Sequence, residues 1–169
     1  DIEADMTEYG WQQKPHFITR HLDLWGEYSV PFQTNAFGMN EDEIDLGNPR
    51  GLRRIAFFGD SFTEAAQVER RHNFMKRAEA ILAGVFGPNI QTLNFGCAGY
   101  GTDQSYLRYQ IQGRLFRPDI VVYMCTMGND AFDVSIELNR GLLGYKPFYD
   151  AARDTWIPFG WKIYATYYI

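Results

Sequence analysis

Through the middle of the chain, short apolar runs alternate with stretches in which apolar residues recur at helical spacing. Residues 55–58 form a run typical of a buried strand, which ends at Gly59, and residues 90–95 form a second such run. Between them the helical spacing continues up to Gly87 and is carried by Phe74, Ala78, Ile81, Leu82 and Val85. This alternation predicts βαβ units and therefore a parallel sheet.

A second helix and a third strand follow. The helix is expected to begin at a cap, Thr102 or Asp103, and to present an apolar face made of Leu107, Ile111 and Leu115. Residues 119–125 predict the third strand, residues 131–138 predict a short helix, and residues 145–169 show no clear period. Right-handed crossovers predict the strand order 2-1-3. Because three strands make an incomplete sheet, we expect an apolar edge and helix faces to remain uncovered.

The first fifty residues have a different character. They are rich in aromatic side chains, are broken by proline and glycine, and end in an acidic patch made of Glu41, Asp42, Glu43 and Asp45. We therefore expect an N-terminal extension, residues 1–50, packed on an α/β domain that spans residues 51–169 and is truncated at its C-terminal end.

The chain has 169 residues, 46% of them hydrophobic, and a formal net charge of -5. This composition excludes a disordered or collagen-like chain, and an acidic balance without a Lys/Arg-rich run argues against nucleic-acid binding. No run of about 20 apolar residues is present to span a bilayer. Cys97 and Cys125 lack the paired spacing of a zinc site, and we expect them to remain unlinked. Neither a metal nor another cofactor is expected.

Polar residues follow each of the three predicted strands, and in a parallel sheet these strand ends lie at one edge. Ser61 is the candidate nucleophile, because a serine at a strand-to-helix turn exposes its hydroxyl for attack on a carbonyl. The backbone N–H groups of Ser61 and Gly99 and the side-chain amide of Asn129 are the candidate oxyanion donors. Asp60 and Asn94 are expected to support these groups through hydrogen bonds.

The three segments involved, residues 59–64, 94–99 and 128–130, resemble blocks of the SGNH/GDSL hydrolase family, which carry the serine, the glycine and the asparagine in this order. The resemblance covers roughly residues 53–133, and Thr63 excludes the Gly-x-Ser-x-Gly elbow of α/β-hydrolases. It implies a three-layer α/β fold with a parallel flavodoxin-like sheet. It also implies a serine esterase or acyl hydrolase whose substrate is a small-molecule, lipid or glycan ester.

A further segment, residues 35–38, resembles the lead-in of family members that are exported or tethered to the membrane. Asn40 departs from this resemblance, because an arginine is often found there. The resemblance implies a periplasmic or other cell-envelope location, with a membrane tether or membrane-protein partner outside these residues.

Family members complete their catalytic triad with an Asp-x-x-His block near the carboxyl end, in which the imidazole deprotonates the serine. This sequence has no histidine after His72, which is expected to be exposed just before a helix that carries it away from the strand ends. His16 or His21 could supply the base only by folding back over the sheet from the extension. Two hypotheses remain open. In the first, the block lies beyond Ile169 and the intact protein is an esterase or acyltransferase. In the second, the chain belongs to a noncatalytic accessory or binding subunit of a membrane-associated assembly.

Overall fold

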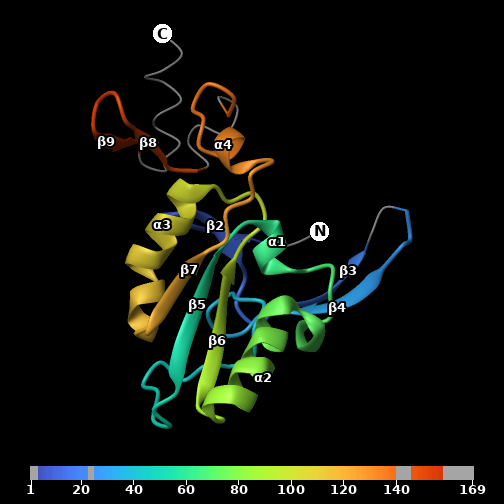
Figure 1. Ribbon diagram of the computed structural model, residues 1–169. Helices are drawn as coiled ribbons and strands as arrows, with labels where there is room; N and C mark the ends of the chain where they lie inside the picture. The colour runs from blue at the N-terminus through green and yellow to red at the C-terminus, as the bar shows by residue number, and fades with distance from the viewer. Residues whose placement is uncertain (1–3, 23–24, 140–145, 158–169) are drawn as a thin grey trace.

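The structure is a computed structural model that describes residues 4–22, 25–139 and 146–157. Two antiparallel hairpins precede an α/β core, and a short hairpin follows it (Figure 1). The hairpins pair β1 (Ala4–Thr7) with β2 (Gly10–Gln13), β3 (Ile18–Leu22) with β4 (Ser29–Gln33), and β8 (Phe148–Asp150) with β9 (Thr155–Ile157). The core contains, in chain order, β5 (Arg53–Gly59), α1 (Ser61–Glu64), the 3₁₀ helix η1 (Arg70–His72), α2 (Phe74–Phe86), β6 (Ile90–Gly96), α3 (Thr102–Ile111), the 3₁₀ helix η2 (Gly113–Phe116), β7 (Ile120–Tyr123) and α4 (Asp130–Asp133).

The core sheet is parallel and has the strand order β6-β5-β7. The first predicted strand therefore lies between the second and the third, as predicted. Phe57 in β5 is paired with Asn94 in β6 and with Val122 in β7. All three strands run in the same direction, so the loops that follow them lie together at one edge of the sheet.

Helices cover both faces of this sheet, because successive side chains of a strand point to opposite faces. Phe57 packs edge-to-face against Phe74 of α2, with ring centroids 5.8 Å apart. Its neighbour Phe58 stacks on Phe95 at 4.6 Å and contacts Tyr109 of α3 at 5.7 Å. The core thus has three layers, with α2 and α3 on opposite sides of the sheet.

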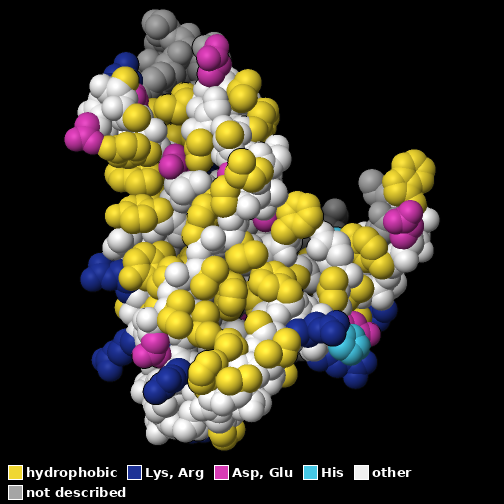
Figure 2. All heavy atoms as spheres, viewed as in Figure 1, with side chains coloured by type: hydrophobic (Ala, Val, Ile, Leu, Met, Phe, Trp, Pro, Cys, Tyr) yellow, Lys and Arg dark blue, Asp and Glu magenta, His cyan; other side chains and the backbone are white. Residues whose placement is uncertain are grey.

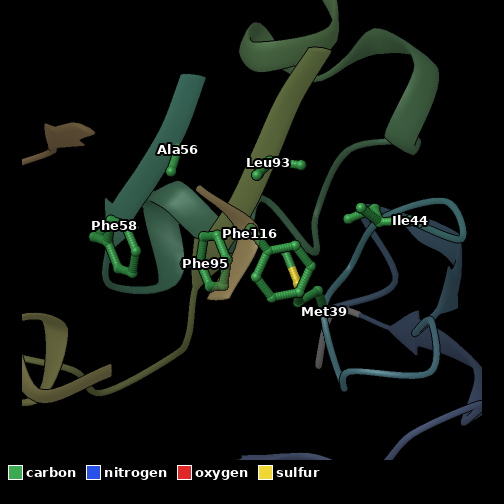
Figure 3. Packing of buried hydrophobic residues seen from close by; sticks show 7 residues of the cluster. All are labelled: Met39, Ile44, Ala56, Phe58, Leu93, Phe95 and Phe116. Carbon is green, nitrogen blue, oxygen red and sulfur yellow. The ribbon is translucent and has the colours of Figure 1, made fainter. Parts of the chain in front are cut away.

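The N-terminal extension contributes side chains to the main hydrophobic core (Figure 3). Met39 and Ile44 precede the sheet in sequence, and both are buried against sheet residues that include Leu93 and Phe95. Phe116, from η2, packs edge-to-face on Phe95 with centroids 5.2 Å apart. The extension therefore forms part of the core in addition to packing on its outside.

The prediction for α3 is wrong in two respects. The residue that caps the helix is Gly101, which makes no side-chain cap, while Asp103 accepts a hydrogen bond from the backbone of Tyr149. The buried residues of α3 are polar rather than apolar, namely Gln104, Ser105 and Arg108, whereas Leu115 is exposed and lies in η2. The reason is tertiary, because this helix face packs on polar groups such as the carbonyl of Tyr9, to which Gln104 donates.

Within the described residues, β7 is the open side of the sheet. Ile120 and Val121 are 53% and 44% exposed. A hollow of about 260 Å³ bordered by Tyr109 lies beside Val121 on the α3 face, and one of about 490 Å³ bordered by Leu82 and Phe86 lies beside Ile120 on the α2 face. Figure 2 shows hydrophobic side chains gathered over this part of the molecule. For the part of the chain that the structure describes, the expectation of an uncovered apolar edge is confirmed.

The last part of the chain is only partly described. The short helix predicted over residues 131–138 is present as α4, which is shorter and begins at Asp130. Trp156 of β9 stacks on Tyr106 of α3, with ring centroids 6.1 Å apart. The predictions for residues 140–145 and 158–169 lie outside the described residues. No described helix is both long and apolar enough to cross a membrane.

Candidate active site

The candidate nucleophile lies in the turn that joins β5 to α1. Asp60 caps α1, and its carboxylate accepts a hydrogen bond from the backbone N–H of Phe62 at 2.9 Å. Ser61 is the first residue of the helix and is half-buried. Its hydroxyl has no hydrogen-bond partner within the part of the chain that the structure describes, so it is available to a ligand.

Two glycines allow α1 to lie directly on the ends of the strands. A Cβ atom on Gly96 would lie 2.2 Å from the backbone nitrogen of Glu64 and 2.5 Å from the carbonyl carbon of Thr63. A Cβ atom on Gly59 would lie 2.2 Å from the Thr63 hydroxyl. Any larger residue at these positions would push the nucleophile turn away from the sheet.

The glycine loop after β6 forms the second wall of the site. Its start is joined to β5, because the N–H of Cys97 donates to the carbonyl of Gly59 at 3.1 Å. Gly99 has a φ of +78°, a conformation that favours glycine, and a Cβ atom there would lie 3.0 Å from Cζ2 of Trp11. The loop thus holds its backbone close to the nucleophile turn and against an aromatic ring from the extension.

The third candidate residue, Asn129, is joined directly to the nucleophile turn. Its Nδ2 donates to Oδ2 of Asp60 at 3.0 Å, although the two residues are 69 positions apart. A carboxamide nitrogen carries two protons, so one N–H of Asn129 remains free for a substrate oxygen. Asp60 therefore orients both the start of α1 and the side chain of Asn129.

The loop that carries Asn129 is held by a neighbouring carboxylate. Asp130 is buried, and its Oδ2 accepts hydrogen bonds from the Tyr123 hydroxyl at 2.7 Å and from the N–H of Thr126 at 2.9 Å. Burial, together with the hydrogen bond to Asp130, raises the pKa of Tyr123, so the phenol remains a donor at neutral pH. Asp133, at the end of α4, lies 3.7 Å from the buried amine of Lys146.

Asn94 lies behind the site, as does Asn40 from the extension. Both donate through Nδ2 to the backbone carbonyl of Glu64, at 3.2 and 2.9 Å. Asn94 also accepts from the N–H of Gly96 at 2.9 Å. The two asparagines therefore provide hydrogen-bond donors for the carbonyl at the end of α1, and they fix this end to β6 and to the extension.

Glu64 supports the site through a distant partner that the sequence does not indicate. Its carboxyl is buried and accepts a hydrogen bond from Nε2 of Gln13 at 2.9 Å. Burial raises the pKa of this carboxyl, against the opposing effects of Gln13 and of the Arg108 guanidinium. No local pattern marks this role, because Gln13 lies 51 positions away in sequence.

Among the described residues, no contact places any of the three histidines at Ser61. His16 lies 3.3 Å from Glu43, and His21 stacks on Tyr28 in the hairpin that projects to one side of the sheet (Figure 1). His72 is exposed, as predicted, and lies 3.8 Å from Glu69. The described residues therefore hold a serine and candidate oxyanion donors without an imidazole base.

The two cysteines are unlinked, as predicted. Cys97 is buried, and this burial raises the pKa of its thiol to about 12, so the thiol stays protonated and unreactive at neutral pH. Cys125 is exposed beside the loop of Asn129. Among the described residues, no group of three or more His, Cys, Asp or Glu side chains is arranged to hold a metal ion.

No protein-family model matches this sequence, and no curated protein matches it.

Proposed function

We propose that this chain carries the nucleophile and the oxyanion hole of an SGNH/GDSL-type serine esterase or acyltransferase. Ser61 would attack the ester carbonyl, and the negative charge that develops on the carbonyl oxygen would be bound by the N–H groups of Ser61 and Gly99 and by the Asn129 amide. The flavodoxin-like version of the α/β fold is part of this proposal.

The observation that carries the proposal is the hydrogen bond between Asn129 and Asp60. It joins the loop after β7 to the residue that immediately precedes the serine. Because the carboxylate of Asp60 accepts one of the two amide protons of Asn129, the other proton can be donated to an oxyanion. The glycine loop is joined to the same turn through Cys97 and Gly59.

The proposed reaction also needs a general base for the serine proton. Because the histidines of this chain contact Glu43, Tyr28 and Glu69, we place the base outside these 169 residues. The substrate class is a small-molecule, lipid or glycan ester. The proposed compartment is the cell envelope. This part of the proposal is based on the resemblance of residues 35–38.

The test is ester hydrolysis by the full-length protein, with p-nitrophenyl acetate as the probe. Ser61→Ala is expected to abolish turnover, and Asn129→Ala to lower kcat by about 100-fold or more, the usual cost of losing one oxyanion donor. A matched control is Asn48→Ala, because Asn48 donates to and accepts from the backbone of Leu52 in a surface loop before β5. Turnover that survives Ser61→Ala would refute the proposal.

The free Ser61 hydroxyl without an imidazole partner favours a second candidate, a noncatalytic accessory or binding subunit. This candidate predicts a folded full-length protein with no turnover of the ester. It also predicts that Ser61→Ala leaves binding to partners unchanged. Turnover by the wild-type protein would exclude it.

A further inference from the structure

Strand β2 of the N-terminal extension contacts both loops that carry the proposed backbone oxyanion donors. Nε1 of Trp11 donates to the carbonyl of Ala98 at 3.0 Å, and Nε2 of Gln13 donates to Oε1 of Glu64 at 2.9 Å. Side chains two positions apart on a strand point to the same side. Trp11 and Gln13 therefore reach the core together, one to the glycine loop and the other to the nucleophile helix.

The two contacts meet close together in the core. The carboxyl of Glu64, which accepts from Gln13, also has its pKa lowered by the backbone N–H of Ala98, the residue whose carbonyl accepts from Trp11. Because Glu64 ends the four-residue helix that begins at Ser61, β2 is tied both to the serine turn and to the glycine loop.

Trp11 also determines the orientation of one peptide unit. The Ala98 carbonyl that accepts from the indole belongs to the same peptide unit as the N–H of Gly99. A trans peptide unit is planar, so its carbonyl and its N–H point in opposite directions. The indole that holds the carbonyl therefore directs the Gly99 N–H away from itself, and its Cζ2 atom limits the movement of Gly99.

We propose that Trp11 and Gln13 are positioning residues that direct the N–H groups of Gly99 and Ser61 toward one reacting oxygen. The inference rests on the proposed function and deepens it, because it assigns the geometry of the oxyanion hole to a strand of the extension. Neither side chain touches the reacting atoms. Trp11 acts through Ala98, and Gln13 acts through Glu64.

The first experiment uses Trp11→Phe in the full-length protein, a change that removes the indole donor and the Cζ2 contact. The matched control is Gln12→Leu, because Gln12 lies on the same strand and accepts instead from the Tyr9 hydroxyl at 2.6 Å. We expect Trp11→Phe to shift the Gly99 amide signal in ¹⁵N–¹H spectra and to lower kcat for p-nitrophenyl acetate by about 10- to 100-fold, with KM changed little. Gln12→Leu is expected to change neither. An unmoved Gly99 signal in Trp11→Phe would overturn the inference.

The second experiment tests Gln13 by rescue. Gln13→Glu alone places two carboxyl groups in contact and is expected to lower kcat. The double variant Gln13→Glu/Glu64→Gln restores the pairing, because the introduced amide can donate to the introduced carboxylate. We expect the double variant to recover kcat to within about threefold of wild type. A double variant as slow as the single one would contradict a positioning role for Gln13.

The proposed function and the positioning role of Trp11 can be refuted separately. Turnover that persists in Ser61→Ala refutes the proposed function, whereas the Gly99 signal still decides whether Trp11 orients this peptide. Loss of turnover in Ser61→Ala, combined with wild-type kcat in Trp11→Phe, refutes the positioning role alone.

Discussion

The β5–β6 side of the core sheet is buried, whereas the β7 side is open. Residues 92–96 of β6 are all buried although they include Thr92 and Asn94, whereas no residue of β7 is buried although its four residues are all hydrophobic. The difference follows from what covers each strand. The extension, α1, α2 and α3 pack around β5 and β6, while within the described residues hollows lie beside β7 on both faces.

This difference divides the candidate site. Ser61 and Gly99 lie in loops held by the extension through Trp11 and Gln13. Asn129 follows the open strand, and among the described residues its side chain makes one hydrogen bond, to Asp60. Two of the proposed donors are thus fixed by a packed core, and the third is fixed by polar contacts at its edge.

The largest expected contrast is in thiol reactivity. Cys125 is exposed and is expected to react with iodoacetamide directly, although a hydrogen bond with Asp130 raises the pKa of its thiol. Cys97 is buried and requires opening of the core, which for an ordinary domain costs at least about 5 kcal/mol and slows reaction by a thousandfold or more. Peptide mass spectrometry over time measures both rates. Equal rates at the two cysteines would show that the β5–β6 side is not sealed.

The next contrast is in stability. Phe95 is fully buried, so Phe95→Ala is expected to lower the free energy of unfolding by about 3–5 kcal/mol. Val121 on β7 is 44% exposed, so Val121→Ala is expected to cost less than about 1 kcal/mol. Urea unfolding followed by circular dichroism gives both values. Comparable losses would mean that β7 is covered in solution.

Two glycines provide a sharper test at the site itself. Gly96→Ala places a Cβ atom 2.2 Å from the backbone of α1 and is expected to cost about 1–3 kcal/mol. Gly128, in the loop before Asn129, has open space around it, so Gly128→Ala is expected to change stability by less than about 0.5 kcal/mol. The same unfolding measurement applies. A harmless Gly96→Ala would contradict the close approach of α1 to the sheet.

The smallest expected effect is the dependence of the free energy of unfolding on pH. Burial raises the pKa of Glu64 above 4.5, so the folded state keeps this proton to higher pH than the unfolded state does. The contribution of Glu64 to the free energy of unfolding therefore falls as pH rises from about 4.5 through the pKa of the folded state. Glu64→Gln is expected to remove this fall, as seen by comparing unfolding at pH 5 and pH 7.5. If the free energy of unfolding fell by the same amount in Glu64→Gln and in wild type, a group other than Glu64 would be responsible.

Much of the core was predictable because its signals are local. Each signal spans only one strand or a few helical turns. These signals are the apolar run at residues 55–58, the helical spacing that ends at Gly87 and the run at residues 119–125. The polar residues after each strand were also readable, since a parallel sheet brings such ends to one edge. The strand order followed from crossover handedness.

The supporting contacts of the site were decided by the tertiary structure. Trp11 and Ala98 are 87 positions apart, and Gln13 and Glu64 are 51 positions apart. The inward face of α3 is polar for the same reason, because Gln104 meets the carbonyl of Tyr9 across 95 positions. Periodicity reports only whether a residue prefers an apolar or a polar neighbour, whereas the partner of a buried polar group depends on which distant segment packs there.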